Sequence, residues 1–338
     1  KKISLSKKLI LRLSLIISSI ILSFILYSIL PFKAPTSYFL FQKTNNLLKL
    51  GKNQEAITVS QGIIKQDPLF LAVYPLIASA YERLGDNKSA LKYYFEYAFN
   101  SQKKQDNKNA ACAYIKIGWV YQLSGEYNKA FDFYNKALTV SKENKDSLNY
   151  STALRKIAVW YIDKENYDKA LELLMKALNF DRERQNIYGH RYNLACDYFD
   201  IGLVFADKDD FDTAREFYKK SQVIFEKLNL KNEFSDYYFN LGETYLYEKQ
   251  YGLTLEYYLK GLRLDQAHQD NPNIARDYNM IGELYMEMGD FAQAENYFFK
   301  IRKRSPILTQ FNRSTFGMII DKFNDFFHQI PSLYGVKF

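Results

Sequence analysis

The chain has 338 residues, enough for two globular domains, and carries a formal net charge of +8 with 17% aromatic residues. Residues 1–33 contain six Lys and Arg and no acidic residue, so residues 34–338 carry a net charge of only +2. A nucleic-acid-binding surface needs clustered basic residues. No basic stripe runs along the middle of the chain, and we therefore expect no nucleic-acid partner.

The first predicted element is a transmembrane helix at residues 9–30, with Arg12 as its one charged residue. About 20 apolar residues span a bilayer. A cleaved signal peptide is the alternative, but its apolar core is usually about 7–15 residues long and is followed by a small-x-small site, which is absent here. The basic residues in 1–8 predict a cytoplasmic N-terminus, with all later residues on the periplasmic or other extracytoplasmic side of the membrane. The linker 31–36 would keep the next element within roughly 20 Å of the bilayer.

The most informative stretch covers residues 111–137. Apolar residues spaced near 3.6 predict one helix over about Ala111–Leu123 and a second over about Tyr127–Thr139. Gly125 lies between them and suits the positive φ that ends a helix. Gly118 costs about 1 kcal/mol relative to alanine inside a helix, which indicates that a neighbouring helix leaves no room there for a side chain.

The same skeleton recurs along the chain, mostly at 40-residue spacing. Its first small residue is found at Thr44, Ala78, Gly118, Ala158, Gly202, Gly242 and Gly282. A large side chain follows three positions later, at Leu47, Tyr81, Tyr121, Tyr161, Phe205, Tyr245 and Tyr285. A second small residue follows at twelve positions, at Ala56, Ala90, Ala130, Ala170, Ala214, Thr254 and Ala294. Thr44, Thr254 and Gly261 depart from the small apolar residue expected at their positions.

The arrangement of Gly118, Tyr121, Gly125, Ala130 and Tyr134, followed by Ala137, resembles the tetratricopeptide repeat (TPR). The resemblance implies an all-α superhelical solenoid of about seven helix-turn-helix repeats at 37–306. The usual repeat has 34 residues, and six more would add roughly 9 Å of helix to each hairpin. Each hairpin would bury its apolar face by stacking on its neighbours.

Two further segments are predicted from the same pattern. The polar stretch Ser101–Asn109 is predicted to be a loop between the second and third repeats. Residues 307–338 are predicted to be a terminal segment whose amphipathic helix, at 313–330, caps the last repeat. A docking helix for a partner is the alternative for that segment.

The sequence shows no motif for catalysis, for a cofactor or for a metal. There is no phosphate-binding Gly-rich loop and no nucleophile motif. His190, His268 and His328 lie far apart, the first two in predicted inter-hairpin loops, and none has a partner at metal-ligand spacing. Cys112 and Cys196 hold the same position two repeats apart, too distant for a disulfide, so two free thiols are expected. We expect a non-enzymatic protein without a small-molecule substrate.

The TPR resemblance also implies a concave groove lined by the first helix of each hairpin. The residues that this predicts for partner binding are Ile115, Trp119, Leu123, Arg155, Val159, Ile162, Phe199, Leu203, Phe239, Leu246 and Tyr247. Such an apolar run would mark a contact surface if it is exposed. The alternative is a tightly closed superhelix in which these side chains pack on each other.

Together these features predict a membrane-tethered protein-interaction scaffold. Its partners would be proteins of a membrane-associated complex in the cell envelope, such as a secretion or flagellar machine, at the inner membrane. A membrane-anchored chaperone or translocon accessory that holds exported polypeptides is the alternative.

Overall fold

The structure, a computed structural model, describes residues 36–230, 235–268 and 271–304. Over these ranges the chain is helical throughout, with fourteen α-helices and one short 3₁₀ helix. Within the same ranges, no helix combines the length and the apolar character needed to cross a membrane. The predicted transmembrane helix at 9–30 and the predicted terminal helix at 313–330 lie outside the described residues.

The described residues divide into two compact units between Asn149 and Tyr150. Unit 1 contains α2 (Thr36–Lys49), α3 (Asn53–Gln66), η1 (Leu71–Val73), α4 (Tyr74–Arg83), α5 (Asn87–Lys103), α6 (Asn107–Leu123) and α7 (Tyr127–Glu143). Helix α8 (Ser147–Ile162) begins just before the division. Unit 2 continues with α9 (Tyr167–Glu183), α10 (Tyr188–Asp207), α11 (Phe211–Lys227), α12 (Ser235–Tyr247), α13 (Tyr251–His268), α14 (Asn271–Glu287) and α15 (Phe291–Arg304).

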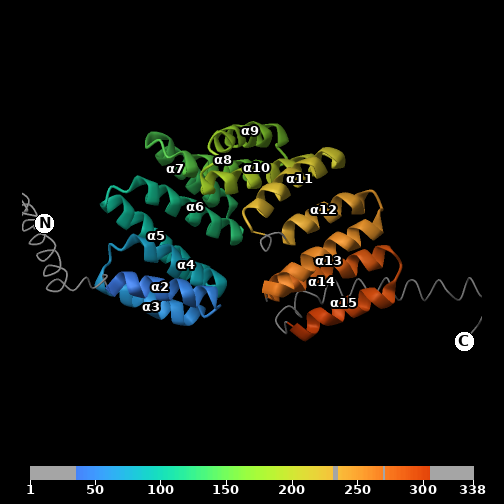
Figure 1. Cartoon of the computed structure of the whole chain (residues 1–338), viewed down its shortest axis with the longest axis horizontal. Helices are drawn as coiled ribbons and strands as arrows, with labels where there is room; N and C mark the ends of the chain where they lie inside the picture. Colours follow the sequence, from blue (N-terminus) through green and yellow to red (C-terminus); the bar gives the residue numbers. More distant parts are fainter. Residues whose placement is uncertain (1–35, 231–234, 269–270, 305–338) are drawn as a thin grey trace, which may run out of the picture. The chain divides into compact units, whose positions relative to one another are not determined.

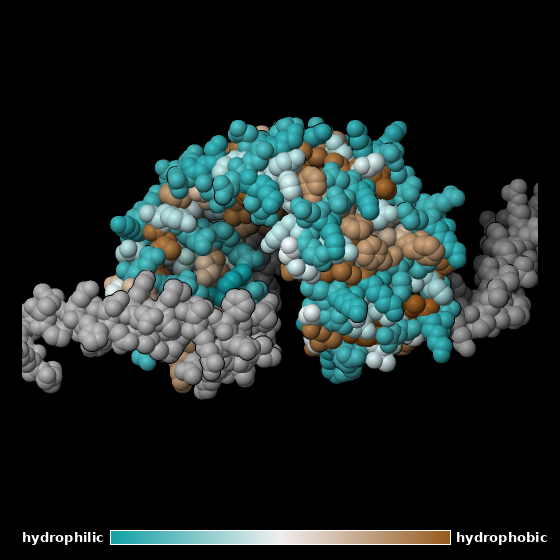
Figure 2. Space-filling model, turned by 180° about the vertical axis from the view of Figure 1, so that it is seen from behind, coloured by the Kyte–Doolittle hydropathy of each residue, from teal (hydrophilic) through white to brown (hydrophobic). Residues whose placement is uncertain are grey.

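The helices follow each other as seven pairs, and Figure 1 shows successive helices lying side by side within each unit. This confirms the predicted series of helical hairpins. Most of the face seen in Figure 2 is hydrophilic, with smaller hydrophobic areas between. Amphipathic helices that turn one face to a core and the other to solvent produce this pattern.

Glycines inside first helices allow the two helices of a hairpin to approach closely. A Cβ at Gly118 would lie 2.5 Å from Cε1 of Tyr134, and one at Gly202 would lie 2.5 Å from Cε1 of Tyr218. A Cβ at Gly242 would meet the Tyr258 ring at 2.7 Å. The predicted reason for these glycines, a neighbouring helix that leaves no room, is confirmed.

Two threonines replace small apolar residues without leaving an unpaired hydroxyl. Thr44 is fully buried, and its Oγ1 donates to the Leu40 carbonyl oxygen at 3.0 Å. Thr254 is also fully buried, and its Oγ1 donates to the Gln250 carbonyl oxygen at 3.3 Å. A buried hydroxyl is tolerated when it is hydrogen-bonded in this way.

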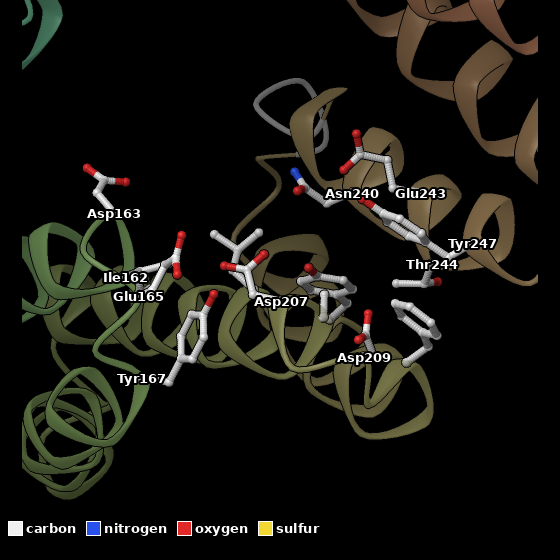
Figure 3. Close-up of a pocket in the computed structure, with 14 residues that line it drawn as sticks. Ile162, Asp163, Glu165, Tyr167, Asp207, Asp209, Asn240, Glu243, Thr244 and Tyr247 are labelled. Carbon is white, nitrogen blue, oxygen red and sulfur yellow. The ribbon is translucent and has the colours of Figure 1, made fainter.

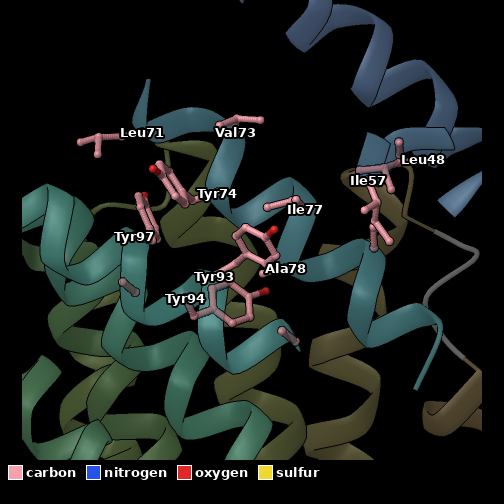
Figure 4. Packing of buried hydrophobic residues seen from close by; sticks show 14 of the residues in the cluster. Leu48, Ile57, Leu71, Val73, Tyr74, Ile77, Ala78, Tyr93, Tyr94 and Tyr97 are labelled. Atoms are coloured by element: carbon pink, nitrogen blue, oxygen red, sulfur yellow. The ribbon is translucent and has the colours of Figure 1, made fainter. Parts of the chain in front are cut away.

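Tyrosine rings fill much of the space between helices, as the high tyrosine content suggested. In unit 1, Tyr74 and Tyr94 are among the largest fully buried side chains, and Figure 4 shows them beside Tyr93, Tyr97 and Ile77. The Tyr74 and Tyr97 rings are stacked with centroids 6.5 Å apart.

The loop predicted at Ser101–Asn109 is wrong. Helix α5 continues to Lys103 and α6 begins at Asn107, so the turn between them is short. Asp106 caps α6, because its carboxylate accepts a hydrogen bond from the Asn109 amide nitrogen at 3.1 Å. The residues in excess of the usual repeat therefore lengthen the two helices, as the period itself indicated.

The turn inside each hairpin places one residue in the left-handed conformation. Four hairpins use glycine there: Gly51, Gly85, Gly125 and Gly289, with φ between 71° and 76°. Three hairpins of unit 2 use other residues: Glu165 (φ 56°), Asp209 (φ 60°) and Lys249 (φ 59°). A left-handed conformation is uncommon for residues that carry a Cβ.

Candidate functional site

Unit 2 contains a pocket of about 430 Å³ where the C-terminal ends of three first helices, α8, α10 and α12, adjoin two hairpin turns. Ile162 at the end of α8, Leu203 and Ala206 of α10, and Thr244 of α12 are among its lining residues. Pockets that bind ligands commonly measure about 300–1,000 Å³. We name this cavity the α8–α12 pocket.

Five carboxylates line the pocket: Asp163, Glu165, Asp207, Asp209 and Glu243. Among the residues that the structure describes, none of those that line the pocket is Lys, Arg or His. Figure 3 shows Asp163 and Glu165 on one side and Glu243 on the other, with Asp207 between them. The pocket is therefore a concentrated negative site.

Burial is the main cause that raises the pKa values of three of these carboxylates. Burial raises the pKa of Asp163, against a smaller opposing effect of Lys164. Burial and the neighbouring Asp163 raise the pKa of Asp207. Burial and Asp207 raise the pKa of Glu243, while Arg276 lowers it. A positive charge placed among them would favour their ionised forms.

Aromatic side chains form the remainder of the pocket. The rings of Phe211 and Tyr247 are stacked with centroids 5.3 Å apart. Tyr167 and Tyr218 also line the cavity. Tyr218 is fully buried, and its hydroxyl has no hydrogen-bond partner. An unsatisfied hydroxyl in a buried position costs free energy until a ligand or water pairs with it.

Three of the residues predicted to bind a partner meet in this pocket: Ile162, Leu203 and Tyr247. Tyr247 is 71% exposed. Phe199, four residues before Leu203, is partly buried and packs on the Tyr218 ring with centroids 5.4 Å apart. Leu246 and Val159 are also partly buried, and Leu246 packs against the core formed by α12 to α15.

Other predicted residues lie in unit 1 or inside the core. Leu123 is exposed and Trp119 is partly buried, both in α6. Ile115, Arg155 and Phe239, which the resemblance also implied for the groove, are buried. A helix-face pattern cannot tell whether the adjacent hairpin covers a given side chain.

Phe239 is buried because its own repeat makes room for it. A Cβ at Gly261 would lie 2.5 Å from Cε2 of Phe239, so the ring occupies the space that a side chain at 261 would need. Phe239 also packs on Tyr258 with ring centroids 5.1 Å apart. The departure at Gly261 was the signal in the sequence that could have revealed this.

Arg155 is buried because it belongs to an ionic network between α8 and α10. Its Nη1 donates to Oδ2 of Asp200 at 3.2 Å, and its Nε lies 3.8 Å from Oδ1 of Asp197. Both carboxylates are buried, and burial raises the pKa of each. Arg155 therefore links α8 to α10 through these two carboxylates.

The network continues from α10 to α9 through His190, which sequence analysis placed in a loop. His190 lies in α10, is buried, and forms a hydrogen bond through Nδ1 with Asp181. Oγ of Ser151 donates to the same carboxylate at 3.0 Å, and Nδ2 of Asn193 donates to Ser151 at 3.2 Å. The prediction of a loop at His190 is wrong, because these contacts hold the residue within the helix.

A pair of aspartates between α13 and α14 is equivalent in register to Asp181 and Asp197. Asp265 and Asp277 are both buried, and Nη2 of Arg276 lies 3.9 Å from Asp265 and 3.5 Å from Asp277. Burial, then the neighbouring Asp265, raises the pKa of Asp277 to about 8. Asp181 and Asp265 hold the same register position, and so do Asp197 and Asp277; that repetition was a signal that sequence analysis missed.

The part of the chain that the structure describes holds no group of three His, Cys, Asp or Glu side chains placed to bind a metal ion. Cys112 and Cys196 are free thiols in partly buried positions. Burial raises the pKa of both, that of Cys196 to about 11. Neither thiol is activated as a nucleophile, because the thiolate is the reactive form.

Comparison with family models assigns the repeats. One model described as tetratricopeptide repeat matches residues 69–143 and 109–183, and a second with the same description matches 235–268 and 275–300. The chain contains tetratricopeptide repeats. No curated protein sequence matches the chain. The fold is an all-helical, TPR-like solenoid of the kind that serves as a protein-interaction scaffold.

Solved structures with this fold include the apo form of RapI, at 14% identity, covering 80% of this chain and 98% of that one with a TM-score of 0.60. The Rap conjugation gene regulator of plasmid pLS20 in complex with the Phr* peptide is similar at 13% identity, over 82% and 76% of the chains, with a TM-score of 0.59. The APC/C hetero-tetramer Cut9–Hcn1 is similar at 15% identity, over 83% and 48% of the chains, with a TM-score of 0.56. At these identities the similarity concerns the fold alone.

Proposed function

We propose that the chain is a non-enzymatic scaffold that binds a segment of a partner protein across the first helices of unit 2. The α8–α12 pocket is the observation that carries this proposal, since it gathers Ile162, Leu203 and Tyr247 around one cavity. The Rap regulator of pLS20, which shares the fold, is in complex with a peptide. That precedent supports a peptide segment as the ligand.

The scaffold is tethered to a membrane in this proposal. Residues 9–30 are predominantly apolar with Arg12 as their one charged residue, and basic residues precede them. In this proposal the repeats lie on the extracytoplasmic side of the inner membrane, close to the bilayer, and the basic residues before the apolar segment support that orientation. The partner is then a protein of a cell-envelope complex.

Photo-crosslinking in cells tests the binding proposal. A photoreactive amino acid replaces Tyr247, which is exposed in the pocket, and in a matched control it replaces Met175, an exposed residue of α9 that does not line the pocket. We expect one or two proteins to crosslink at position 247 and not at 175. Adducts are identified by mass spectrometry.

The pattern of adducts separates the candidate functions. One or two recurrent envelope proteins support the scaffold. A broad set of exported polypeptides favours the membrane-anchored chaperone instead. Equal crosslinking at 247 and 175 contradicts a role for the pocket.

Fractionation tests the tether. We expect the full chain to stay in the membrane pellet after alkaline carbonate extraction. Protease added outside the inner membrane should then digest the repeats without lysis of the cytoplasm. Release by carbonate, or protection of the repeats until the inner membrane is broken, would contradict the proposed arrangement.

A further inference from the structure

The α8–α12 pocket lies beside a buried tyrosine whose neighbour on the first helix is small and apolar. In two hairpins of unit 1 the buried tyrosine of the second helix pairs instead with a polar side chain of the first helix. Tyr94 donates to Glu82 Oε2 at 3.2 Å, and Tyr134 donates to Gln122 Oε1 at 2.8 Å. The residue equivalent to Glu82 and Gln122 in the α10–α11 hairpin is Ala206.

The alanine leaves both a space and an unsatisfied group. Ala206 lines the pocket, and the hydroxyl of Tyr218, equivalent to those of Tyr94 and Tyr134, has no hydrogen-bond partner. Tyr218 is fully buried and lines the same pocket. A buried polar atom of this kind needs a partner, and the cavity beside it can admit one.

The surrounding charges indicate which kind of chemical group can pair with the Tyr218 hydroxyl. Carboxylates from the α8–α9 turn, from α10 and from α12 face one cavity. Lys164 acts on Asp163, and Arg276 on Glu243, from outside the lining. The carboxylates are not grouped at metal-ligand distances within the described ranges. An extended cation that reaches several of them fits the arrangement better than a single ion.

The aromatic residues of the lining indicate which kind of cation fits the pocket. Phe211 and Tyr247 form a stacked pair on the lining. A guanidinium is planar, stacks on aromatic faces, and donates several hydrogen bonds in fixed directions. It can therefore contact the rings while it donates to carboxylates and to the Tyr218 oxygen.

We propose that the α8–α12 pocket receives the side chain of an arginine in the bound partner segment. This inference rests on the proposed function, because the arginine is part of the peptide segment that the scaffold binds. Asp207 and Glu243 pair with the guanidinium, and the Tyr218 hydroxyl oxygen accepts one of its hydrogen bonds. The aromatic pair packs against its face.

Panning tests the proposal with the full chain, purified in detergent, and a library of random twelve-residue peptides. We expect the enriched peptides to share an arginine at one position. The same panning with the double variant Asp207→Asn/Glu243→Gln should lose that preference. The control Asp168→Asn/Glu183→Gln removes the same charge from two exposed residues of α9 and should keep it.

Affinity measurements then compare an enriched peptide with its citrulline counterpart, which keeps the shape of arginine without the charge. We expect the citrulline peptide to bind at least about tenfold more weakly to the unchanged protein. Asp207→Asn/Glu243→Gln should reduce arginine-peptide binding to the same level. Tyr218→Phe should weaken arginine-peptide binding several-fold without lowering Tm, a result that a purely structural role for the hydroxyl would not produce.

The outcomes distinguish this inference from the function on which it rests. Enrichment of peptides without a basic residue, or equal affinity for the citrulline peptide, overturns the arginine pocket and leaves peptide binding standing. If no peptide is enriched, both the arginine pocket and the proposed peptide binding are overturned. Spermidine carries positive charge without a peptide, and tighter binding of spermidine than of the arginine peptide would overturn a partner segment as the ligand.

Discussion

Close glycine–aromatic contacts determine how tightly each hairpin packs. Gly118, Gly202 and Gly242 each lie against a tyrosine ring of the paired helix, and Gly282 lies against Phe298. A glycine in a helix is unfavourable in isolation, so its recurrence at one register position carries information about packing. This is why the sequence alone could predict these contacts.

The substitution Gly202→Ala should destabilise unit 2. Its Cβ would lie 2.5 Å from Cε1 of the fully buried Tyr218, and overpacking of this kind costs about 1–3 kcal/mol. Gly252→Ala is the control, because nothing lies within 4 Å of its Cβ position. Urea denaturation measures both variants. Equal stability of Gly202→Ala and the unchanged protein would show that the Tyr218 ring can move aside.

Other residues were not predictable from the helix pattern alone. Phe239 and Tyr247 both fall on first-helix positions assigned to the groove, yet Phe239 is 3% exposed and Tyr247 is 71% exposed. The difference arises from Gly261 on the paired helix, which admits the Phe239 ring. Sequence periodicity gives the direction in which a side chain points, but burial depends on the residues opposite it.

At the scale of helices, ionisable side chains meet at two junctions between hairpins. Arg155 joins α8 to Asp197 and Asp200 of α10, and Asp265 of α13 lies close to Arg276 of α14. The apolar pattern predicted the helices themselves, although the excess residues at Ser101–Asn109 proved to be helical. The apolar pattern could not predict the buried Asp and Arg side chains, because their burial depends on which residues of the neighbouring helix pair with them.

The acidic pair at the α13–α14 junction makes stability depend on pH. The pKa of Asp277 is about 8 in the folded chain and 3.8 ordinarily, so the folded state retains a proton that the unfolded state releases. This contribution is complete below about pH 4 and is lost as the pH rises through about 8. We expect Asp277→Asn to flatten the fall in stability between pH 5 and 9.

The variant should be more stable than the unchanged protein at pH 9, by on the order of 2 kcal/mol, because the Asn side chain carries no charge to bury beside Asp265. Thermal denaturation across this pH range provides the measurement. Asp168→Asn, at a side chain that is 98% exposed, is the control and should leave the pH profile unchanged. An identical profile for Asp277→Asn would mean that Asp277 is ionised throughout.

At the scale of the molecule, stability should be distributed along the repeats. In a solenoid each hairpin contacts its neighbours, so its stability is approximately a sum of local and nearest-neighbour contributions. The register of small residues identified this architecture from sequence. The location of the pocket was not predictable, because it depends on the small side chain of Ala206 and on turns from two hairpins.

Hydrogen exchange can detect this distribution. Gly242→Ala would bring a Cβ to 2.7 Å from the Tyr258 ring, and exchange should accelerate in α12, α13 and the adjacent helices. Helices α2 to α5 should keep their protection. Accelerated exchange in every helix would instead indicate that the chain unfolds as one cooperative unit.

The turns that border the pocket carry a cost that the four glycine turns avoid. Glu165 and Asp209 adopt the left-handed conformation that four hairpins give to glycine, and both place a carboxylate on the pocket. Replacing both by glycine should raise the free energy of unfolding by roughly 0.5–1 kcal/mol and weaken peptide binding. Lys249→Gly should also gain stability, without an effect on binding, because Lys249 has a similar φ and does not line the pocket. Selection for thermal tolerance alone would therefore replace Glu165 and Asp209 by glycine and weaken peptide binding. Retention of these two residues in a screen for binding would reveal a trade-off between stability and binding.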